Sequence, residues 1–195
     1  MGKTVYHTAT SIDGYIADKD NSLQWLFDVD GGEMPELDGS EEAPDGTKDD
    51  FDAFISEVGA ACSGSTTYEW VLDAAGIRDK PETWPYKFPT WVLTSKEREG
   101  VPGADIRFHN GDVREAHRQM KEAAGDKDIW IIGGGDLAGQ FADAGLLDEV
   151  TVTVAPVFLG GGAPLLPRRM ASDRLTLENV NRQRQFVNLT YSVDK

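Results

Sequence analysis

The chain has 195 residues, 39% of them hydrophobic, and this length and composition suit one compact domain with its own core. Its formal net charge of −15 at pH 7 argues against nucleic acid and against anionic membrane surfaces as partners, because both would repel it. A single cysteine, Cys62, excludes an internal disulfide and lies in an apolar segment typical of an inert core thiol. There is no secretory signal pattern, and no apolar run approaches the roughly 20 residues of a membrane span. These features predict a cytoplasmic protein.

Segments typical of strands and helices alternate along most of the chain. Apolar and β-branched runs predict strands, and apolar residues at helical spacing predict helices. The predicted strands cover residues 3–9, 15–17, 58–63, 90–94, 106–109, 128–132, 149–154, 174–180 and 186–193. The predicted helices cover residues 49–57, 66–74, 113–123 and the segment from the glycine-rich turn to residue 144. This order predicts a single α/β domain over residues 1–195, with three layers, a mixed and mostly parallel sheet, and an antiparallel strand pair at the carboxyl terminus.

The segment from about residue 28 to residue 50 differs in composition from the rest of the chain. It carries ten acidic residues and one basic residue, so it contributes −9 of the net charge, and it is interrupted by glycines and prolines. Such a segment cannot bury enough apolar surface to offset the entropy lost on ordering. We expect an inserted acidic loop, in which residues 33–49 form a mobile lid or rim rather than part of the core.

Three consecutive glycines, at positions 133–135, join a predicted strand to a predicted helix. Glycine lets another group approach the backbone closely, and the start of the following helix offers unpaired N–H groups to an anion. The spacing of Gly133, Gly135 and Ala138 also fits the dinucleotide pattern G-x-G-x-x-[GA]. That pattern requires an acidic residue near the end of the next strand, and residues 154–157 hold none, so a Rossmann domain is excluded. Two interpretations of residues 133–135 stay open: a phosphate-binding turn and a plain tight turn.

Three further segments favour anion binding. Gly64 precedes a predicted helix in which Thr66 and Glu69 form a capping-box pattern, and the strand ending near residue 94 is followed by Ser95 and Lys96. A second glycine run occupies residues 160–162. Each segment also has an ordinary structural explanation. The segment at Gly64 would be a capped helix start, the segment after residue 94 a solvated loop, and residues 160–162 a turn. The sequence has no HExxH or CxxC pattern, so we expect no metal site.

Six segments, in their order along the chain, resemble the dihydrofolate reductase-like superfamily, and above all the reductase domain of the bifunctional riboflavin-biosynthesis deaminase/reductases. The segments are SIDGYIA, GSTTYE, VLTSK, IIGGGDLAGQF, GLLDEV and PVFLGGGAPL. The resemblance spans residues 3–191 and implies a dihydrofolate reductase-like fold. It further implies an NADPH-dependent oxidoreductase, with NADH as an alternative cofactor, that transfers hydride to a small pterin-, pyrimidine- or riboflavin-precursor-like heterocycle. It also implies a homodimer, for which the alternating apolar residues of the last strand would supply an apolar face.

The resemblance implies a role for residues in several of these segments. The cofactor pyrophosphate would lie against Gly133, Gly134, Gly135, Asp136 and Leu137. The phosphates of the cofactor would also meet Gly64, Ser65 and Thr66. The adenosine ribose and its 2′-phosphate would meet Thr94, Ser95 and Lys96. The nicotinamide would border Ala9, Ile16 and Ala17. The candidate catalytic acids are Asp13 and Asp50, and Asp30 is an alternative to Asp50. Asp13 and Gly14 would shape the loop beside the substrate, with a plain hairpin turn as the alternative.

One departure from the family pattern affects the choice of cofactor. The family commonly has Arg after the glycine of its G-R-x-T-x-E motif, where this chain has Ser65. The planar guanidinium of Arg would bind phosphate better, so the preference for NADPH over NADH stays open. The loss of this Arg and of a clear catalytic acid keeps a second hypothesis open, namely a non-catalytic nucleotide-binding or sensing protein on the same fold.

Overall fold

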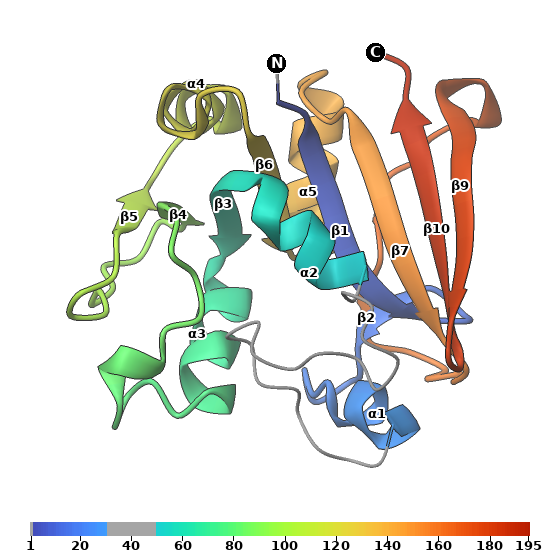
Figure 1. The fold of residues 1–195 in the computed structure, drawn as a ribbon, viewed down its shortest axis with the longest axis horizontal. Helices are drawn as coiled ribbons and strands as arrows, with labels where there is room; N and C mark the ends of the chain where they lie inside the picture. The colour runs from blue at the N-terminus through green and yellow to red at the C-terminus, as the bar shows by residue number, and fades with distance from the viewer. Residues whose placement is uncertain (1, 31–49) are drawn as a thin grey trace. The chain divides into compact units, whose positions relative to one another are not determined.

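The computed structural model describes residues 2–30 and 50–195 (Figure 1). The lid expected at residues 33–49, and most of the acidic insertion around it, lies outside these residues. The chain divides into two compact units. Among the described residues, the first unit comprises residues 2 and 50–129, and the second comprises residues 3–30 and 130–195. The single domain expected over residues 1–195 stays a prediction.

The first unit contains three parallel strands and three α-helices. Its strands lie in the order β5 (Ile106–His109), β4 (Thr90–Leu93) and β3 (Val58–Gly64), and both neighbouring pairs are parallel. Its helices are α2 (Asp50–Glu57), α3 (Ser65–Ala74) and α4 (Val113–Ala124), with a 3-10 turn, η2 (Pro81–Thr83). Parallel strands are normally covered on both faces, and β3 and β4 are mostly buried. One core cluster of this unit consists of Tyr68, Val71, Leu72, Ile77, Val92 and Val101.

The second unit contains a five-stranded mixed sheet. Its strands lie in the order β6 (Asp128–Gly133), β1 (Thr4–Ser11), β7 (Glu149–Ala155), β10 (Phe186–Val193) and β9 (Leu175–Gln183). Strand β1 is parallel to β7, whereas β10 is antiparallel to both β7 and β9. A separate antiparallel pair is formed by β2 (Tyr15–Ala17) and β8 (Ala163–Pro164). The remaining elements are α1 (Gln24–Phe27), η1 (Asp28–Asp30), α5 (Gly135–Asp143) and η3 (Ser172–Arg174).

Two buried polar contacts tie the core of the second unit together. The Tyr6 hydroxyl donates to the Leu165 carbonyl at 2.9 Å, and the Trp130 indole donates to the His7 carbonyl at 3.0 Å. Both ring systems are buried, and burial raises the pKa of the Tyr6 hydroxyl. The side chains therefore satisfy their polar atoms inside the core, as buried Tyr and Trp normally do.

The predicted fold class is confirmed: the chain has a mostly parallel sheet with helices and an antiparallel carboxyl-terminal strand pair. The strands predicted at 106–109 and 186–193 match the observed ones, and β9 continues to Gln183 instead of ending at residue 180. Cys62 is fully buried, as predicted, and burial raises the pKa of its thiol. No helix within residues 2–30 and 50–195 is long and apolar enough to cross a membrane.

The plain hairpin considered for Asp13 and Gly14 is wrong. Gly14 does make a tight turn, with φ of +83° and a bond from its N–H to the Ser11 carbonyl at 3.0 Å. However, β2 does not return along β1 and instead pairs with β8. The turn therefore directs the chain from β1 toward β8. Leu165, next to β8, donates its N–H to the Gly14 carbonyl at 2.9 Å, which holds the turn there.

Candidate functional site

The parallel strands of the first unit bring two of the predicted residue groups to one edge. Gly64 at the end of β3 is in register with Leu93 at the end of β4, and Leu93 is in register with His109 at the end of β5. The groups that follow these strand ends, at 64–66 and at 94–96, therefore emerge beside each other. The carboxyl edge of a parallel sheet is where ligands bind in many α/β proteins.

The start of α3 differs from the capping box predicted for Thr66 and Glu69. The helix begins at Ser65, its N-cap is Gly64 in an extended conformation, and no side chain caps it. Glu69 does not turn back to the helix start because two guanidinium groups hold its carboxylate: it pairs with Arg78 and, at 3.0 Å, with Arg98. Within residues 2–30 and 50–195, no side-chain cap is found for α3, and a Cβ at Gly64 would meet nothing within 4 Å.

The predicted ribose group forms a turn directly after β4. The Thr94 N–H donates to the His109 carbonyl at 2.9 Å, and the Thr94 hydroxyl accepts the Lys96 N–H at 3.1 Å. Thr94 therefore shapes the turn, whereas the side chains of Ser95 and Lys96 are exposed at its tip. Of the three predicted contacts, Ser95 and Lys96 are the two that can meet a ligand freely.

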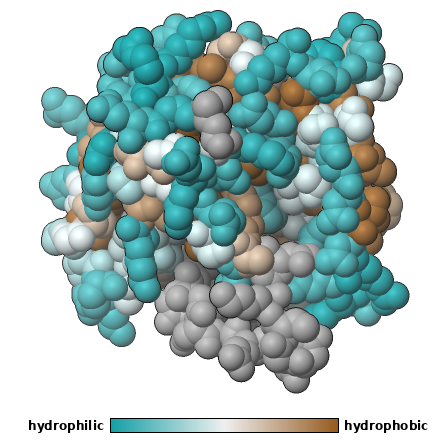
Figure 2. All heavy atoms as spheres, turned by 45° about the horizontal axis from the view of Figure 1, so that its top comes forward, coloured by the Kyte–Doolittle hydropathy of each residue, from teal (hydrophilic) through white to brown (hydrophobic). Residues whose placement is uncertain are grey.

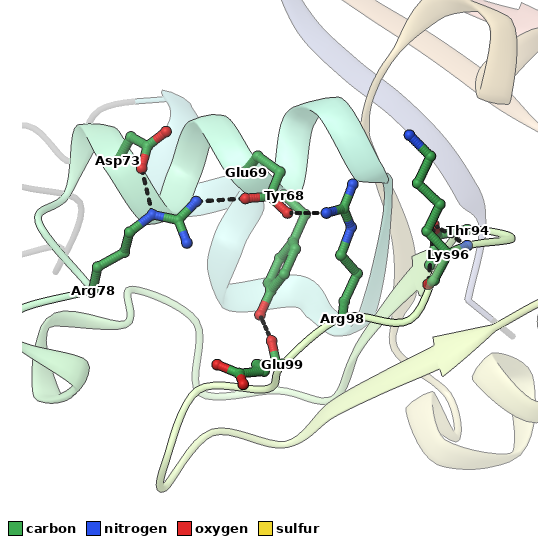
Figure 3. Close-up of polar contacts among 8 residues, drawn as sticks. All are labelled: Tyr68, Glu69, Asp73, Arg78, Thr94, Lys96, Arg98 and Glu99. Atoms are coloured by element: carbon green, nitrogen blue, oxygen red, sulfur yellow. Dashed lines mark hydrogen bonds and ion pairs between the residues drawn. The ribbon is translucent and has the colours of Figure 1, made fainter.

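A charged cluster extends along α3 from this turn (Figure 3). Arg78 donates to Asp73 at 2.6 Å and to Glu69, and these bonds, that to Asp73 first, raise the pKa of its guanidinium. Arg98 reaches Glu69 from the loop after β4. Tyr68 fixes this loop to α3, because its hydroxyl donates to the Glu99 carbonyl at 2.7 Å. Arg98 was not among the predicted site residues, although its position two residues after Lys96 was a signal for it.

The three glycines at residues 133–135, in the turn of the second unit, have different structural roles. Gly133 ends β6 with φ of +156°, its peptide bond to Gly134 is cis, and Gly134 is the N-cap of α5 without a side-chain cap. A Cβ on Gly135 would lie 2.3 Å from the Pro164 carbonyl oxygen, so this glycine is required by the close approach of the chain. A Cβ on Gly134 would meet only the Ile16 Cδ1, at 3.9 Å. Gly134 is therefore the position in the turn with room for a ligand against the backbone.

Asp136 and Leu137, predicted beside the pyrophosphate, have other contacts. Leu137 is buried in the core. The Asp136 carboxylate accepts Gln140 and Arg168, each at 2.9 Å, and the bond from Gln140, followed by that from Arg168, lowers its pKa. Arg168 also donates to Asp143 at 2.9 Å, so it links the segment after β8 to both ends of α5. An ionised carboxylate on the first turn of α5 stabilises the helix but would repel a phosphate from that side.

Asp13 holds two loops of the second unit together. Its carboxylate accepts the Ser11 hydroxyl at 2.6 Å and the N–H groups of Leu159 and Gly160 at 3.1 and 2.7 Å. The Ser11 bond, and then the two backbone bonds, lower the pKa of Asp13, although desolvation acts in the opposite direction. A carboxylate held in its charged form donates no proton at neutral pH, so this geometry favours a structural role for Asp13 over a role as catalytic acid.

The remaining predicted residues lie in different places. Ala9, Ile16 and Ala17 are half-buried, and Ile16 lies beside Gly134, which joins the predicted nicotinamide group to the glycine turn. Asp50 is the first residue of α2, and its side chain and that of Asp30 lie outside the described part of the chain. Among the described residues, no group of three His, Cys, Asp or Glu side chains could hold a metal ion.

The chain resembles proteins of one family over most of its length. Residues 71–187 match the family model of the RibD C-terminal domain. The chain is 30% identical over 189 residues to the uncharacterized protein YwjB of Bacillus subtilis, with 97% of each chain covered. It also resembles the structure of a putative riboflavin biosynthesis protein from Shewanella sp. PV-4, with a TM-score of 0.73, 27% identity and 99% of both chains covered.

Two further structures share the fold at lower identity. One is the diaminohydroxyphosphoribosylaminopyrimidine deaminase/5-amino-6-(5-phosphoribosylamino)uracil reductase of Thermotoga maritima, with a TM-score of 0.66 and 14% identity over 99% of this chain and 57% of that one. The other is the dihydrofolate reductase of Enterococcus faecalis in complex with NADP(H), with a TM-score of 0.60 and 16% identity over 100% of this chain and 98% of that one. The resemblance that the six sequence segments implied is confirmed at the level of family and fold.

Proposed function

The chain belongs to the RibD C-terminal domain family, and from that premise we propose that it is a reductase that uses NADPH to reduce a small heterocycle of the pyrimidine or pterin class. One structure with the same fold is named a uracil reductase, and another is a dihydrofolate reductase in complex with NADP(H). The first name supports a nitrogen heterocycle as the acceptor, and the second supports a nicotinamide cofactor.

The observation that carries this proposal is the glycine-capped start of α3, and the second unit, taken by itself, has a similar helix start at α5. In the described part of the chain, neither α3 nor α5 has a side-chain cap, and Gly64 and Gly134 both leave room beside the backbone. Such helix starts suit anionic phosphate groups, because they combine free N–H donors with the positive end of the helix dipole. The cationic side chains of Lys96 and Arg98, near the start of α3, add to the fit. The described residues therefore suit a phosphate-bearing cofactor.

Each residue group has a separate task under this proposal. The bound dinucleotide would supply the hydride. Ser95 and Lys96 would hold a ribose phosphate, and Gly134 would let the backbone approach the pyrophosphate. The apolar side chains of Ala9, Ile16 and Ala17 would exclude water from the face that receives the ring, and catalysis would come mainly from positioning. Because three hydrogen bonds already hold the Asp13 carboxylate, the proton would come from water or from Asp50.

The hydrogen bonds that hold the Asp13 carboxylate also favour a second candidate function, a nucleotide sensor without catalysis. A sensor would bind the cofactor but would need no proton donor, and the three hydrogen bonds to Asp13 favour a structural role for one of the two candidate acids. Titration with NADPH and NADH, followed by a screen of oxidised pterins and pyrimidines for cofactor oxidation, separates the two. Turnover of any acceptor supports the reductase, and tight binding without turnover supports the sensor. Binding of neither cofactor would exclude both.

Ser65 and Lys96 provide a test of how the cofactor is selected. Ser65→Arg adds charge-assisted hydrogen bonds at the start of α3, and bonds to charged groups contribute roughly 1.5–3 kcal/mol, so we expect NADPH to bind about tenfold more tightly at a half-exposed site. Lys96→Ala should weaken NADPH while sparing NADH, which lacks the 2′-phosphate. Lys80→Ala, at another exposed lysine of the first unit, is the control. Equal shifts in the dissociation constants of both cofactors would mean that neither residue meets the 2′-phosphate.

A further inference from the structure

The glycine run at residues 160–162 begins with a contact to a carboxylate of the chain itself. The N–H groups of Leu159 and Gly160, at the start of the run, donate to the Asp13 carboxylate at 3.1 and 2.7 Å. The Ile12 N–H donates to the Val157 carbonyl at 2.8 Å, so a backbone bond also joins the loop after β7 to the end of β1. Asp13 therefore takes the place of the anion that we expected at the start of this run, and the other two glycines need a separate explanation.

Gly161 and Gly162 let this loop lie directly against the end of β2 and the residues after it. A Cβ on Gly162 would lie 2.0 Å from the Ala17 carbonyl oxygen, and a Cβ on Gly161 would lie 2.7 Å from the Lys19 Cε. Gly162 also has a φ of +143°, which residues with a side chain rarely adopt. The Lys19 side chain can move aside, but the Ala17 carbonyl belongs to β2, which pairs with β8 directly after Gly162. A glycine at 162 is therefore what lets β2 keep its place.

The place of β2 in turn decides where Ile16 lies. Ile16 directly precedes Ala17 in β2, and its Cδ1 lies 3.9 Å from the position that a Cβ on Gly134 would take. Both Ile16 and Ala17 are half-buried. Because a planar peptide unit joins the two residues, a shift of the Ala17 backbone would also move Ile16 relative to Gly134. The contact between Gly162 and Ala17 is thus connected, through β2, to the glycine turn at residues 133–135.

We propose that Gly162 is a positioning residue, which holds Ile16 against the nicotinamide ring of the cofactor by leaving room for the Ala17 carbonyl. The proposal rests on the proposed function, because that function supplies the nicotinamide. Gly162 itself would touch neither the cofactor nor the acceptor. It would act through β2, which sets the apolar wall beside Gly134. A displaced wall would let the ring leave the orientation that hydride transfer requires.

The test compares two ligands that differ in the nicotinamide, using isothermal titration calorimetry on the whole chain. The ligands are NADPH and 2′-phospho-ADP-ribose, which keeps the adenosine, its 2′-phosphate and the pyrophosphate. Gly162→Ala should weaken NADPH about tenfold, as expected when part of an apolar ring surface returns to water, and should leave the fragment within about twofold. Gly160→Ala is the matched control, because Gly160 also has a positive φ, of +65°, but its Cβ would meet nothing within 4 Å. This control should leave the affinity for both ligands within about twofold of the wild type.

The outcomes separate this inference from the proposed function. The inference is overturned if Gly162→Ala weakens both ligands equally or neither, if Gly160→Ala has the same selective effect, or if the wild type binds neither ligand. If Gly162→Ala does not fold, Asp13→Asn decides, because it loosens the same loop at Leu159 and Gly160, and an unchanged ratio of the two affinities overturns the inference. If the selective effect is found but NADPH reduces no acceptor, the inference stands and the reductase proposal fails. If NADPH reduces an acceptor but the selective effect is absent, the reductase proposal stands and the inference fails.

Discussion

Asp13 shows how a residue chosen for its chemistry can have a structural task. The resemblance made it a candidate acid because it would place this carboxylate in the loop beside the substrate. In the structure it accepts bonds from Ser11, Leu159 and Gly160. The two backbone donors lie about 146 positions away along the chain, and a backbone N–H has no sequence signature. This part of the site could not be predicted from the residues alone.

The lowered pKa of Asp13 predicts a dependence of stability on pH. A carboxyl group whose pKa is lower in the folded state stabilises the fold above its unfolded pKa of about 3.9, and this contribution is lost as the pH falls through the folded pKa. The thermal midpoint of the wild type should therefore exceed that of Asp13→Asn by a constant amount from pH 7 to about pH 5, and the difference should shrink below about pH 4.

Asp20→Asn is the control for this measurement, because Asp20 is an exposed carboxylate of the same unit. Differential scanning calorimetry of the three proteins between pH 7 and about pH 3 is sufficient. A difference between wild type and Asp13→Asn that stays constant down to pH 3 would show that the ionised carboxylate is not what holds the two loops together.

The individual elements were more predictable than their partners. The strand-to-helix turns at Gly64 and at residues 133–135 were placed correctly, because glycine between an apolar run and a helical pattern is a local signal. The start of α3 was placed within one residue from Thr66 and Glu69, yet Glu69 makes ion pairs instead of a cap. The pairing of β2 with β8 was missed, because the partner of a three-residue strand depends on distant chain segments.

The packing of α5 against the segment after β8 predicts a severe effect of Gly135→Ala. Alanine favours a helix by about 1 kcal/mol over glycine. Against this, the new Cβ would lie 2.3 Å from the Pro164 carbonyl oxygen and 2.4 Å from that of Leu165, and backbone atoms cannot move aside as a side chain can. We expect a net loss of about 3 kcal/mol in the free energy of unfolding, measured by chemical denaturation.

Gly100→Ala is the matched control, because its Cβ would meet only the Phe108 ring edge at 4.0 Å. Its free energy of unfolding should stay within about 0.5 kcal/mol of the wild type. If Gly135→Ala were as stable as Gly100→Ala, α5 would not approach the segment after β8 as closely as the structure has it.

At the scale of the whole molecule, the sequence carried the family and the fold further than the chemistry. Six segments in their order along the chain were sufficient to identify the family, because each corresponds to a local turn or strand end. The charged cluster around Glu69 depends on residues from α3, from the segment after it and from the loop after β4. Such a cluster forms only when the fold brings these segments together, so the local sequence patterns did not predict it.

The carboxyl-terminal strand pair has an apolar face that remains partly open. Residues paired across an antiparallel ladder point to the same face, and an irregularity beside Glu178 keeps Leu177 and Val180 on one face although they are three positions apart. The apolar residues of this face are Leu175, Leu177, Val180, Val187, Leu189, Tyr191 and Val193, and Arg182, the partner of Val187, lies on the same face near its end. Leu177 and Val180 are 51% and 57% exposed, whereas the polar Asn188 on the opposite face is 8% exposed.

This face supports the homodimer that the family resemblance implied, and we propose that a second copy of the chain covers it. Figure 2 shows hydrophobic surface along the side on which β9 and β10 lie in Figure 1. Exposed apolar side chains grouped in this way mark interfaces more often than scattered ones do. Sedimentation velocity at micromolar concentration should therefore give a dimer. Val180→Glu should give a monomer, because it places a charge within the apolar face, whereas Asn179→Glu, whose partner Thr190 lies on the other face, should leave the dimer intact. A monomeric wild type, or equal dissociation by the two variants, would refute an interface at this face.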